Sequence, residues 1–202
     1  MNKRLETPLH PRDARGVFVS GRVPITPHEL KSLVRTIPDF PVEGIQFRDI
    51  TTLIGHGEGF AATVDWLARR VGDSGASAVA GMEARGFIFG AAVAAKLALP
   101  FLPVRKPGKL PCQTIGIDYA LEYGSDRLEM DPASVAEGQR VAMVDDLLAT
   151  GGTASATAQL LREAGAVVEH AFFVIDLPDL GGAKKLGECG VETASLMEFE
   201  GD

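Results

Sequence analysis

Short apolar segments alternate with segments of helical periodicity along most of the chain after residue 58. Four apolar segments are typical of buried strands and lie at residues 76–82, 100–105, 139–146 and 166–176. Helical patterns occupy residues 58–72, 86–98 and 153–165. This alternation is typical of a parallel sheet whose strands are joined by crossover helices. We therefore predict an α/β fold with a central parallel sheet flanked by helices.

Two segments stand outside this alternation. Residues 106–130 are rich in Gly and Pro and alternate polar with apolar residues, which predicts a long, flexible antiparallel flap. Thr26 and Glu29 have the spacing of a capping box, which predicts the start of a helix. We expect that helix to end before Pro38, because proline disfavours helical backbone in the residue before it.

The overall composition limits the classes of protein to consider. Hydrophobic residues make up 46% of the 202 residues, enough to bury a core. Residues 1–25 show no helical or strand period, so we expect a flexible N-terminal extension followed by a single domain over residues 26–202. The formal net charge of -7 argues against nucleic-acid binding. No apolar run approaches the roughly 20 residues that cross a bilayer, and the two cysteines form no CxxC pair, so we expect a cytoplasmic protein without a disulfide or zinc site.

A loop of small and hydroxylated residues follows the strand that ends near Asp146. In "LLATGGT" (147–153), glycines allow close approach of the backbone to a ligand, and the hydroxyls of Thr150 and Thr153 are additional donors. The loop precedes a predicted helix, whose N-terminus attracts anions. No lysine follows Gly152, so the pattern of nucleoside triphosphate sites is absent. We predict a site for a monophosphate, formed by Ala149, Thr150, Gly151, Gly152 and Thr153.

Asp145 and Asp146 directly precede this loop, although a carboxylate repels a phosphate. Carboxylates accept hydrogen bonds from hydroxyl groups, and a sugar phosphate offers vicinal hydroxyls beside its phosphate. The pairing of two acids with an anion loop therefore predicts a site for ribose 5-phosphate. The alternative is that the acids only complement the positive end of the following helix.

Several stretches resemble one enzyme family. "VAMVDDLLATGGT" (141–153) is similar to the signature with which type I phosphoribosyltransferases bind phosphoribosyl pyrophosphate (PRPP). "FPVEGIQFRDIT" (40–51), "EARGFIFG" (83–90) and "VRKPGKLP" (104–111) resemble the adenine-specific members, and the resemblance extends over residues 26–199. It implies a type I phosphoribosyltransferase fold with a flexible flap or hood. It also implies purine salvage, in which adenine and PRPP give AMP and pyrophosphate with Mg²⁺ as cofactor.

The resemblance also implies roles for individual residues. We expect a pyrophosphate site at Glu83, Ala84 and Arg85, with a non-proline cis peptide between the first two. The catalytic candidates are Asp145, Asp146, Arg85, Tyr119 and Glu122, the last two on the flap. Further candidates for substrate binding are Arg105, Lys106 and Lys109 for the pyrophosphate, and Gln46, Phe47, Arg48 and Leu177 for the base. Direct metal ligands are uncertain, because PRPP itself would hold most of the Mg²⁺, with Asp145 and Asp146 acting through water.

Three further expectations concern partners and alternatives. Arg105 resembles an arginine that reaches into the neighbouring subunit's site, which implies a homodimer. The first alternative function is a phosphoribosyltransferase for another nucleobase, such as a 6-oxopurine or uracil. The second is a regulator that senses PRPP without catalysing a reaction.

Overall fold

The computed structural model describes residues 25–121 and 124–201, and its centre is a five-stranded parallel sheet. The strand order is β4 (Phe101–Val104), β3 (Ala78–Met82), β7 (Arg140–Leu148), β8 (Val167–Asp176) and β9 (Glu192–Glu198). All four neighbouring pairs are parallel. The predicted α/β class and central parallel sheet are therefore confirmed, and β9 is a fifth strand that the apolar pattern did not predict.

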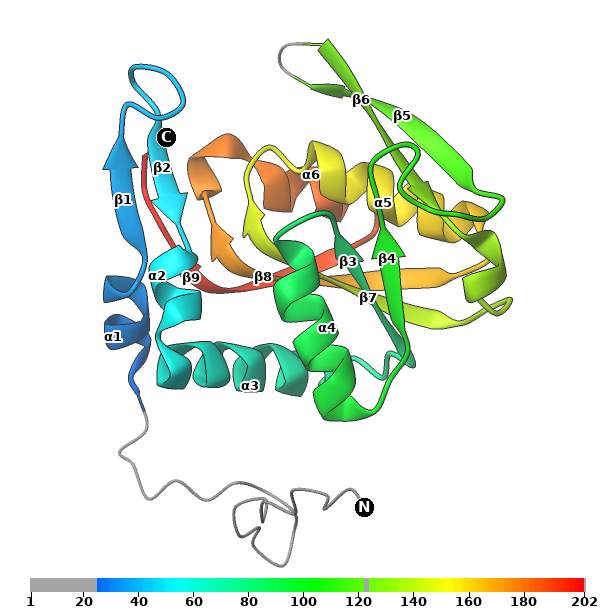
Figure 1. Cartoon of the computed structure of the whole chain (residues 1–202), viewed down its shortest axis with the longest axis horizontal. Coiled ribbons are helices and arrows are strands. Elements are labelled where there is room, and N and C mark those ends of the chain that lie inside the picture. The colour runs from blue at the N-terminus through cyan, green and yellow to red at the C-terminus, as the bar shows by residue number, and fades with distance from the viewer. Residues whose placement is uncertain (1–24, 122–123, 202) are drawn as a thin grey trace, which may run out of the picture.

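Helices cover both faces of this sheet (Figure 1). On one face, α3 (Gly57–Asp73) and α4 (Gly86–Leu97) pack through a core that includes Leu67 and Phe89. On the other face, α5 (Gly152–Glu163) and α6 (Gly182–Glu188) pack through a core that includes Leu160. The remaining helical segments are short: α1 (Pro27–Ser32), α2 (Thr51–Gly55), η1 (Pro132–Ser134) and η2 (Pro178–Leu180).

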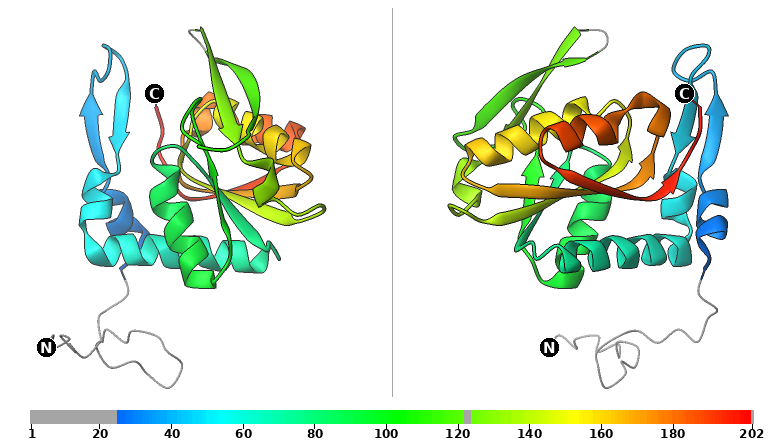
Figure 2. Two further views of the ribbon diagram at one scale, coloured as in Figure 1. Left: turned by 45° about the vertical axis from the view of Figure 1, so that its right-hand side comes forward. Right: turned by 180° about the vertical axis from the view of Figure 1, so that it is seen from behind.

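Two antiparallel hairpins rise from opposite ends of the sheet. One pairs β1 (Arg35–Pro38) with β2 (Gln46–Asp49), and we call it the hood. The other pairs β5 (Ile115–Leu121) with β6 (Gly124–Met130) and is the predicted flap. Both project in the same direction, with the loops that follow β3 and β7 between them (Figure 2).

The first helix is shorter than predicted. The capping box of Thr26 and Glu29 is present, but α1 ends at Ser32, and residues 35–38 form β1. Thr36 and Ile37 are β-branched, and Pro38 favours extended backbone in the residue before it. Pairing with β2 therefore replaces the helix that local spacing favoured.

Asp49 fixes the end of the hood to α2. Its carboxylate accepts a hydrogen bond from the Thr51 N–H at 2.9 Å and forms an ion pair with Arg35. Hydrogen bonds from Thr51, followed by those from Arg35, lower the pKa of Asp49 to about 2. The carboxylate is thus ionised at neutral pH and holds the base of β2 in place.

Candidate active site

The loop after β7 has the geometry of an anion site. Residues 149–151 connect β7 to α5, and the N-cap residue Gly151 adopts a φ of 76°, which favours glycine. Because a glycine has no side chain with which to cap the helix, the N–H groups of the first turn of α5 are left for another acceptor. The helix dipole favours an anion there.

The two acids at the end of β7 share a desolvated corner of the site. Asp146 is only 4% exposed, and the N–H of Asp146 donates to Oδ1 of Asp145 at 2.8 Å. Burial raises the pKa of both carboxyl groups; the charge of Asp146 raises that of Asp145 further, whereas the charge of Arg85 opposes the shift at Asp146. Oδ2 of Asp146 lies 2.8 Å from Nε of Arg85 in an ion pair, although the geometry of that contact is not that of a hydrogen bond. A carboxylate oxygen has two lone pairs, so Oδ2 can also accept from a ligand.

Asp145 lies directly against the start of α4. A Cβ atom on Gly86 would lie 2.6 Å from Oδ1 of Asp145 and 3.2 Å from the carbonyl oxygen of Val144. Any larger residue at position 86 would therefore displace the carboxylate or the helix. Sequence reasoning treated Gly86 only as the beginning of a helix and missed this contact.

The turn between β3 and α4 carries the predicted pyrophosphate site. The peptide bond between Glu83 and Ala84 is cis, as the resemblance implied. The Glu83 carboxylate accepts the Lys106 N–H at 3.0 Å and pairs with Nε of Arg105 at 3.2 Å. The Lys106 N–H contributes most to lowering the pKa of Glu83, and Arg105 contributes less. The Glu83 side chain is therefore ionised and occupied within the protein. The side chain of Arg85 is 44% exposed and pairs with Asp146 at 2.8 Å, so the cation of this turn faces the acids at the end of β7.

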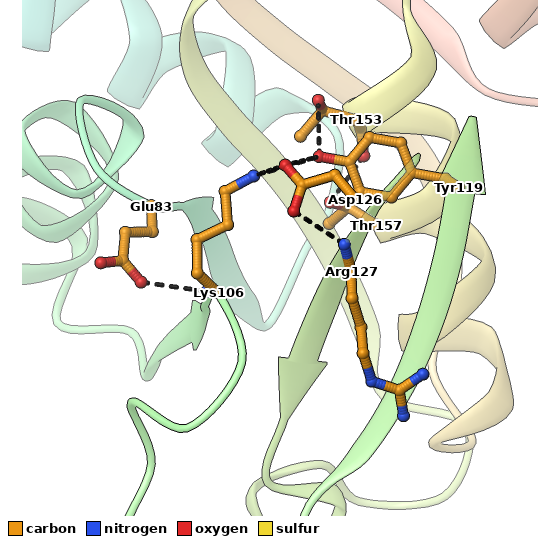
Figure 3. Close-up of polar contacts among 7 residues, drawn as sticks. All are labelled: Glu83, Lys106, Tyr119, Asp126, Arg127, Thr153 and Thr157. Atoms are coloured by element: carbon orange, nitrogen blue, oxygen red, sulfur yellow. Dashed lines mark hydrogen bonds and ion pairs between the residues drawn. The ribbon is translucent and has the colours of Figure 1, made fainter. Parts of the chain in front are cut away.

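The flap contacts both predicted phosphate segments (Figure 3). The Tyr119 hydroxyl donates to Oδ2 of Asp126 at 3.2 Å and accepts from the Thr153 hydroxyl at 3.3 Å. Lys106 forms an ion pair with Asp126 and donates to the Tyr119 hydroxyl at 3.3 Å. Burial opposes the charge on Lys106, but Asp126 and Tyr119 outweigh it and raise the pKa of Lys106. Glu122, the other flap residue predicted for catalysis, lies outside the described residues.

The predicted base-binding residues lie on the hood and after β8. The guanidinium carbon of Arg85 is 5.6 Å from the centre of the Phe47 ring, so the hood reaches the pyrophosphate turn. The Arg48 side chain donates to Thr36 and to the Glu200 carbonyl, which directs its guanidinium to the hood and the C-terminal segment. Leu177 is buried in the core beside α3 and α4, and its N–H donates to the Leu148 carbonyl at 3.0 Å.

One cavity of about 350 Å³ joins the two loops and the two acids. Its lining comprises Glu83, Ala84, Arg85, Lys106 and residues 145–154. Tyr119 lines a second cavity of about 730 Å³ on the other side of Gly152. The other candidates do not line the first cavity: Gln46, Phe47, Arg48, Arg105, Lys109 and Leu177.

Comparisons with known proteins agree with this geometry. The model of the phosphoribosyl transferase domain matches residues 54–185. An adenine phosphoribosyltransferase from Novosphingobium aromaticivorans is 67% identical over 177 residues, which cover 88% of this chain and 99% of that protein. The chain belongs to the adenine phosphoribosyltransferase family.

Solved structures of the adenine phosphoribosyltransferase family confirm the predicted type I fold. The enzyme from Thermoanaerobacter pseudethanolicus superposes with a TM-score of 0.83 at 46% identity and covers 86% of this chain and 100% of its own. The Saccharomyces cerevisiae enzyme, solved with adenine and an imino-altritol bisphosphate, gives a TM-score of 0.80 at 34% identity and covers 85% and 98%. The predicted enzyme class and adenine phosphoribosyltransferase function are confirmed by this membership.

Two kinds of feature, a cluster of metal-binding side chains and a membrane-spanning helix, are absent among the described residues. No three His, Cys, Asp or Glu side chains in residues 25–121 and 124–201 are grouped so that they would bind a metal ion. In the same ranges, no helix has both the length and the apolar character to span a membrane.

Asp126 contacts two of the candidate site residues, Lys106 and Tyr119, and sequence reasoning missed it. It was counted only as part of the flap, because its contacts with Lys106 and Tyr119 exist only once the hairpin has folded. The alternating pattern of residues 106–130 predicted a hairpin but gave no register. A register would have placed Asp126 opposite Tyr119, as it is in the structure.

Proposed function

We propose that this chain transfers the phosphoribosyl group of PRPP to N9 of adenine, using the cavity between the two loops. The bond between C1 and the pyrophosphate oxygen breaks with its electron pair leaving on pyrophosphate. The bond from N9 to C1 forms with inversion, and the N9 proton passes to solvent or to the released pyrophosphate. The observation that supports the proposal is the arrangement in one cavity of two carboxylates, one buried and one half-buried, between two loops suited to anions.

The 5-phosphate of PRPP would bind at residues 149–153. The first turn of α5 supplies backbone N–H groups, and Thr150 and Thr153 supply hydroxyls. The ribose hydroxyls would then meet Asp145 and Asp146, whose charged forms are poorly solvated. A hydroxyl that donates to Oδ2 of Asp146 would add a hydrogen bond to a buried carboxylate that otherwise has the Arg85 ion pair, which favours binding.

The pyrophosphate would bind at the turn of Glu83, Ala84 and Arg85. Arg85 and Lys106 line this side of the cavity, and Lys109 lies farther along the same segment. Negative charge grows on pyrophosphate as the bond to C1 breaks, so cations fixed beside it stabilise the transition state. Arg85 would have to divide its interaction between Asp146 and the leaving group.

No protein nucleophile is required by this reaction. Positive charge develops on the ribose ring, so the chain acts by positioning the reactants and by electrostatic stabilisation. Tyr119 and Glu122 belong to a flap that would exclude water while the reactive cation exists. For the base, the main chain at Gln46 and Arg48 would contact the edge of adenine, with Phe47 and Leu177 against its faces.

We include Mg²⁺ in this proposal because the residues present fit a hard cation held mainly by the substrate. Asp145 and Asp146 line the cavity and supply carboxylate oxygens, the ligand type that Mg²⁺ prefers. When bound, the ion would neutralise charge on the pyrophosphate and orient it against the ribose hydroxyls. We further propose a cytoplasmic homodimer in which Arg105 of one subunit serves the other subunit's site.

Product analysis tests the reaction. Purified protein with PRPP, adenine and Mg²⁺ should form AMP and pyrophosphate in equal amounts, and chelation of Mg²⁺ should stop both. Tight PRPP binding without any AMP would instead support the regulatory alternative. Release of pyrophosphate without AMP would show hydrolysis and would contradict transfer to adenine.

A further inference from the structure

The backbone of the 5-phosphate loop rests directly on the backbone at the start of α6. A Cβ atom on Gly182 would lie 2.2 Å from the carbonyl oxygen of Ala149 and 2.9 Å from two side-chain carbons of Leu148. In the reverse direction, a Cβ atom on Gly151 would lie 3.0 Å from the carbonyl oxygen of Gly182 and 3.1 Å from its Cα. Two segments distant in sequence therefore meet with no side chain between them.

The contact at Gly182 constrains the direction of the Thr150 N–H, one of the loop's hydrogen-bond donors. The carbonyl of Ala149 and the N–H of Thr150 belong to the same planar unit. A methyl group on Gly182 would have to push the Ala149 carbonyl away by roughly 1 Å or more to reach an ordinary contact distance. The Thr150 N–H would tilt with it, and a misplacement of that size can weaken a positioned interaction on the order of a hundredfold.

We propose that Gly182 is a positioning residue for the 5-phosphate of the substrate, and that the start of α6 is the support that sets the orientation of the loop. This inference rests on the proposed function of residues 149–153. It assigns to a glycine after β8 a role in phosphate affinity, although that glycine does not line the cavity itself.

Two neighbouring glycines supply matched controls. Gly187 lies in the same helix and would place a Cβ atom in open space. Gly181 also has no atom within 4 Å of a Cβ, but its φ of 72° makes any larger residue costly. Gly187→Ala thus tests the substitution alone, and Gly181→Ala tests strain beside the loop without a clash.

The experiment compares Gly181→Ala, Gly182→Ala and Gly187→Ala in the full chain. AMP and ribose 5-phosphate affinities are measured by calorimetry, the KM for PRPP by assay, and the thermal midpoint without ligand. For Gly182→Ala we expect both affinities to fall and the KM for PRPP to rise, each at least tenfold. Gly187→Ala should match the wild type, and Gly181→Ala should lower the midpoint while both affinities stay within about twofold.

The outcomes separate this inference from the proposed function. A wild type that binds neither AMP nor ribose 5-phosphate would contradict the proposed function. If the wild type and folded Gly182→Ala bind AMP and ribose 5-phosphate equally well, the positioning role of Gly182 is overturned and the proposed function is not. If Gly182→Ala is unstable, all proteins are compared in trimethylamine N-oxide, which favours the folded state. A Gly182→Ala protein that stays unfolded there, while Gly181→Ala folds, would also overturn the inference by assigning Gly182 to stability.

Discussion

The Nε atom of Arg85 lies 2.8 Å from Oδ2 of Asp146, which joins the pyrophosphate turn to the acids at the end of β7. Asp146 is buried, and its pKa is raised by burial although Arg85 opposes the shift. The residues that we propose for the pyrophosphate and for the ribose are thus paired with each other in the protein without substrate. Among the described residues Asp145 forms no ion pair of its own, and burial and the charge of Asp146 raise its pKa, with Arg85 opposing the shift.

We predict that Asp145→Asn lowers turnover but not stability. Burial and the charge of Asp146 raise the pKa of Asp145, so this carboxyl destabilises the folded state progressively as the pH rises from the ordinary range of aspartate to the raised pKa. Asparagine removes the charge, and the thermal midpoint at pH 7 to 8 should equal or exceed that of the wild type. Turnover should fall about tenfold or more, because a charge-assisted hydrogen bond contributes about 1.5–3 kcal/mol.

Thermal melts of the wild type and Asp145→Asn at several pH values test the expected direction of the change in thermal midpoint. Once the pH falls below the ordinary pKa of aspartate, Asp145 is mostly protonated in both the folded and the unfolded wild-type protein. The difference in thermal midpoint between Asp145→Asn and the wild type should therefore shrink as the pH is lowered from 7 toward 4. A midpoint that drops steeply at pH 7 while each folded molecule keeps full activity would contradict both halves of the prediction.

We predict that Gly86→Ala impairs catalysis more than Gly90→Ala does. Both glycines lie in α4, and a Cβ atom on either would meet a neighbour too closely. At Gly86 that neighbour is the Asp145 carboxylate, and at Gly90 it is the ring of Phe101. Each change should cost roughly 1–3 kcal/mol of stability. Only Gly86→Ala should lower kcat at a temperature where both variants are folded, and equal kcat values would refute the contact's role.

The sheet and the 5-phosphate loop were predictable because their signals are local. Strands buried on both faces appear as continuous apolar runs, as in residues 139–146 and 166–176. The acids, the loop and the helix of the 5-phosphate site follow one another along the chain, so their order alone indicates the site.

Contacts between distant segments were not predictable in this way. Residues 35–38 are a strand only because β2 pairs with them. The contact of Gly182 with Ala149 depends on how α6 packs against the loop, and neither segment shows it alone. The cross-subunit role of Arg105 stays a prediction, since in the single chain Arg105 pairs with Glu83.

We predict that Tyr119→Phe loosens the flap and slows the reaction. The change removes the hydroxyl that contacts both Asp126 and Thr153, each contact being worth about 0.5–1.5 kcal/mol. Amide hydrogen exchange in β5 and β6 should accelerate, and kcat should fall about twofold to tenfold. Asp118→Asn is the control, because Asp118 is an exposed neighbour that pairs with Arg127. Equal exchange rates in wild type and Tyr119→Phe would show that this hydroxyl does not hold the flap.

We predict that two inactive variants complement each other in a mixed dimer. Arg105→Ala lacks the cation given to the partner, and Asp146→Asn lacks an acid of its own site. A heterodimer of the two would contain one intact site, so activity should partly return on mixing. Labelled subunits must first show that exchange occurs. Proven exchange without recovered activity, or full activity in a demonstrated monomer, would assign Arg105 to its own chain or to no role in the site.

The most direct test of the account is the choice of base by the purified wild-type protein. Adenine, hypoxanthine, guanine and uracil are each supplied with PRPP and Mg²⁺, and kcat/KM is measured from nucleotide formation, with Asp146→Asn as the control for site-dependent turnover. We expect AMP as the main product, with kcat/KM for adenine at least a hundredfold above the other bases and loss of that activity in Asp146→Asn. Preferred conversion of another base, or AMP formation that Asp146→Asn leaves unchanged, would contradict it.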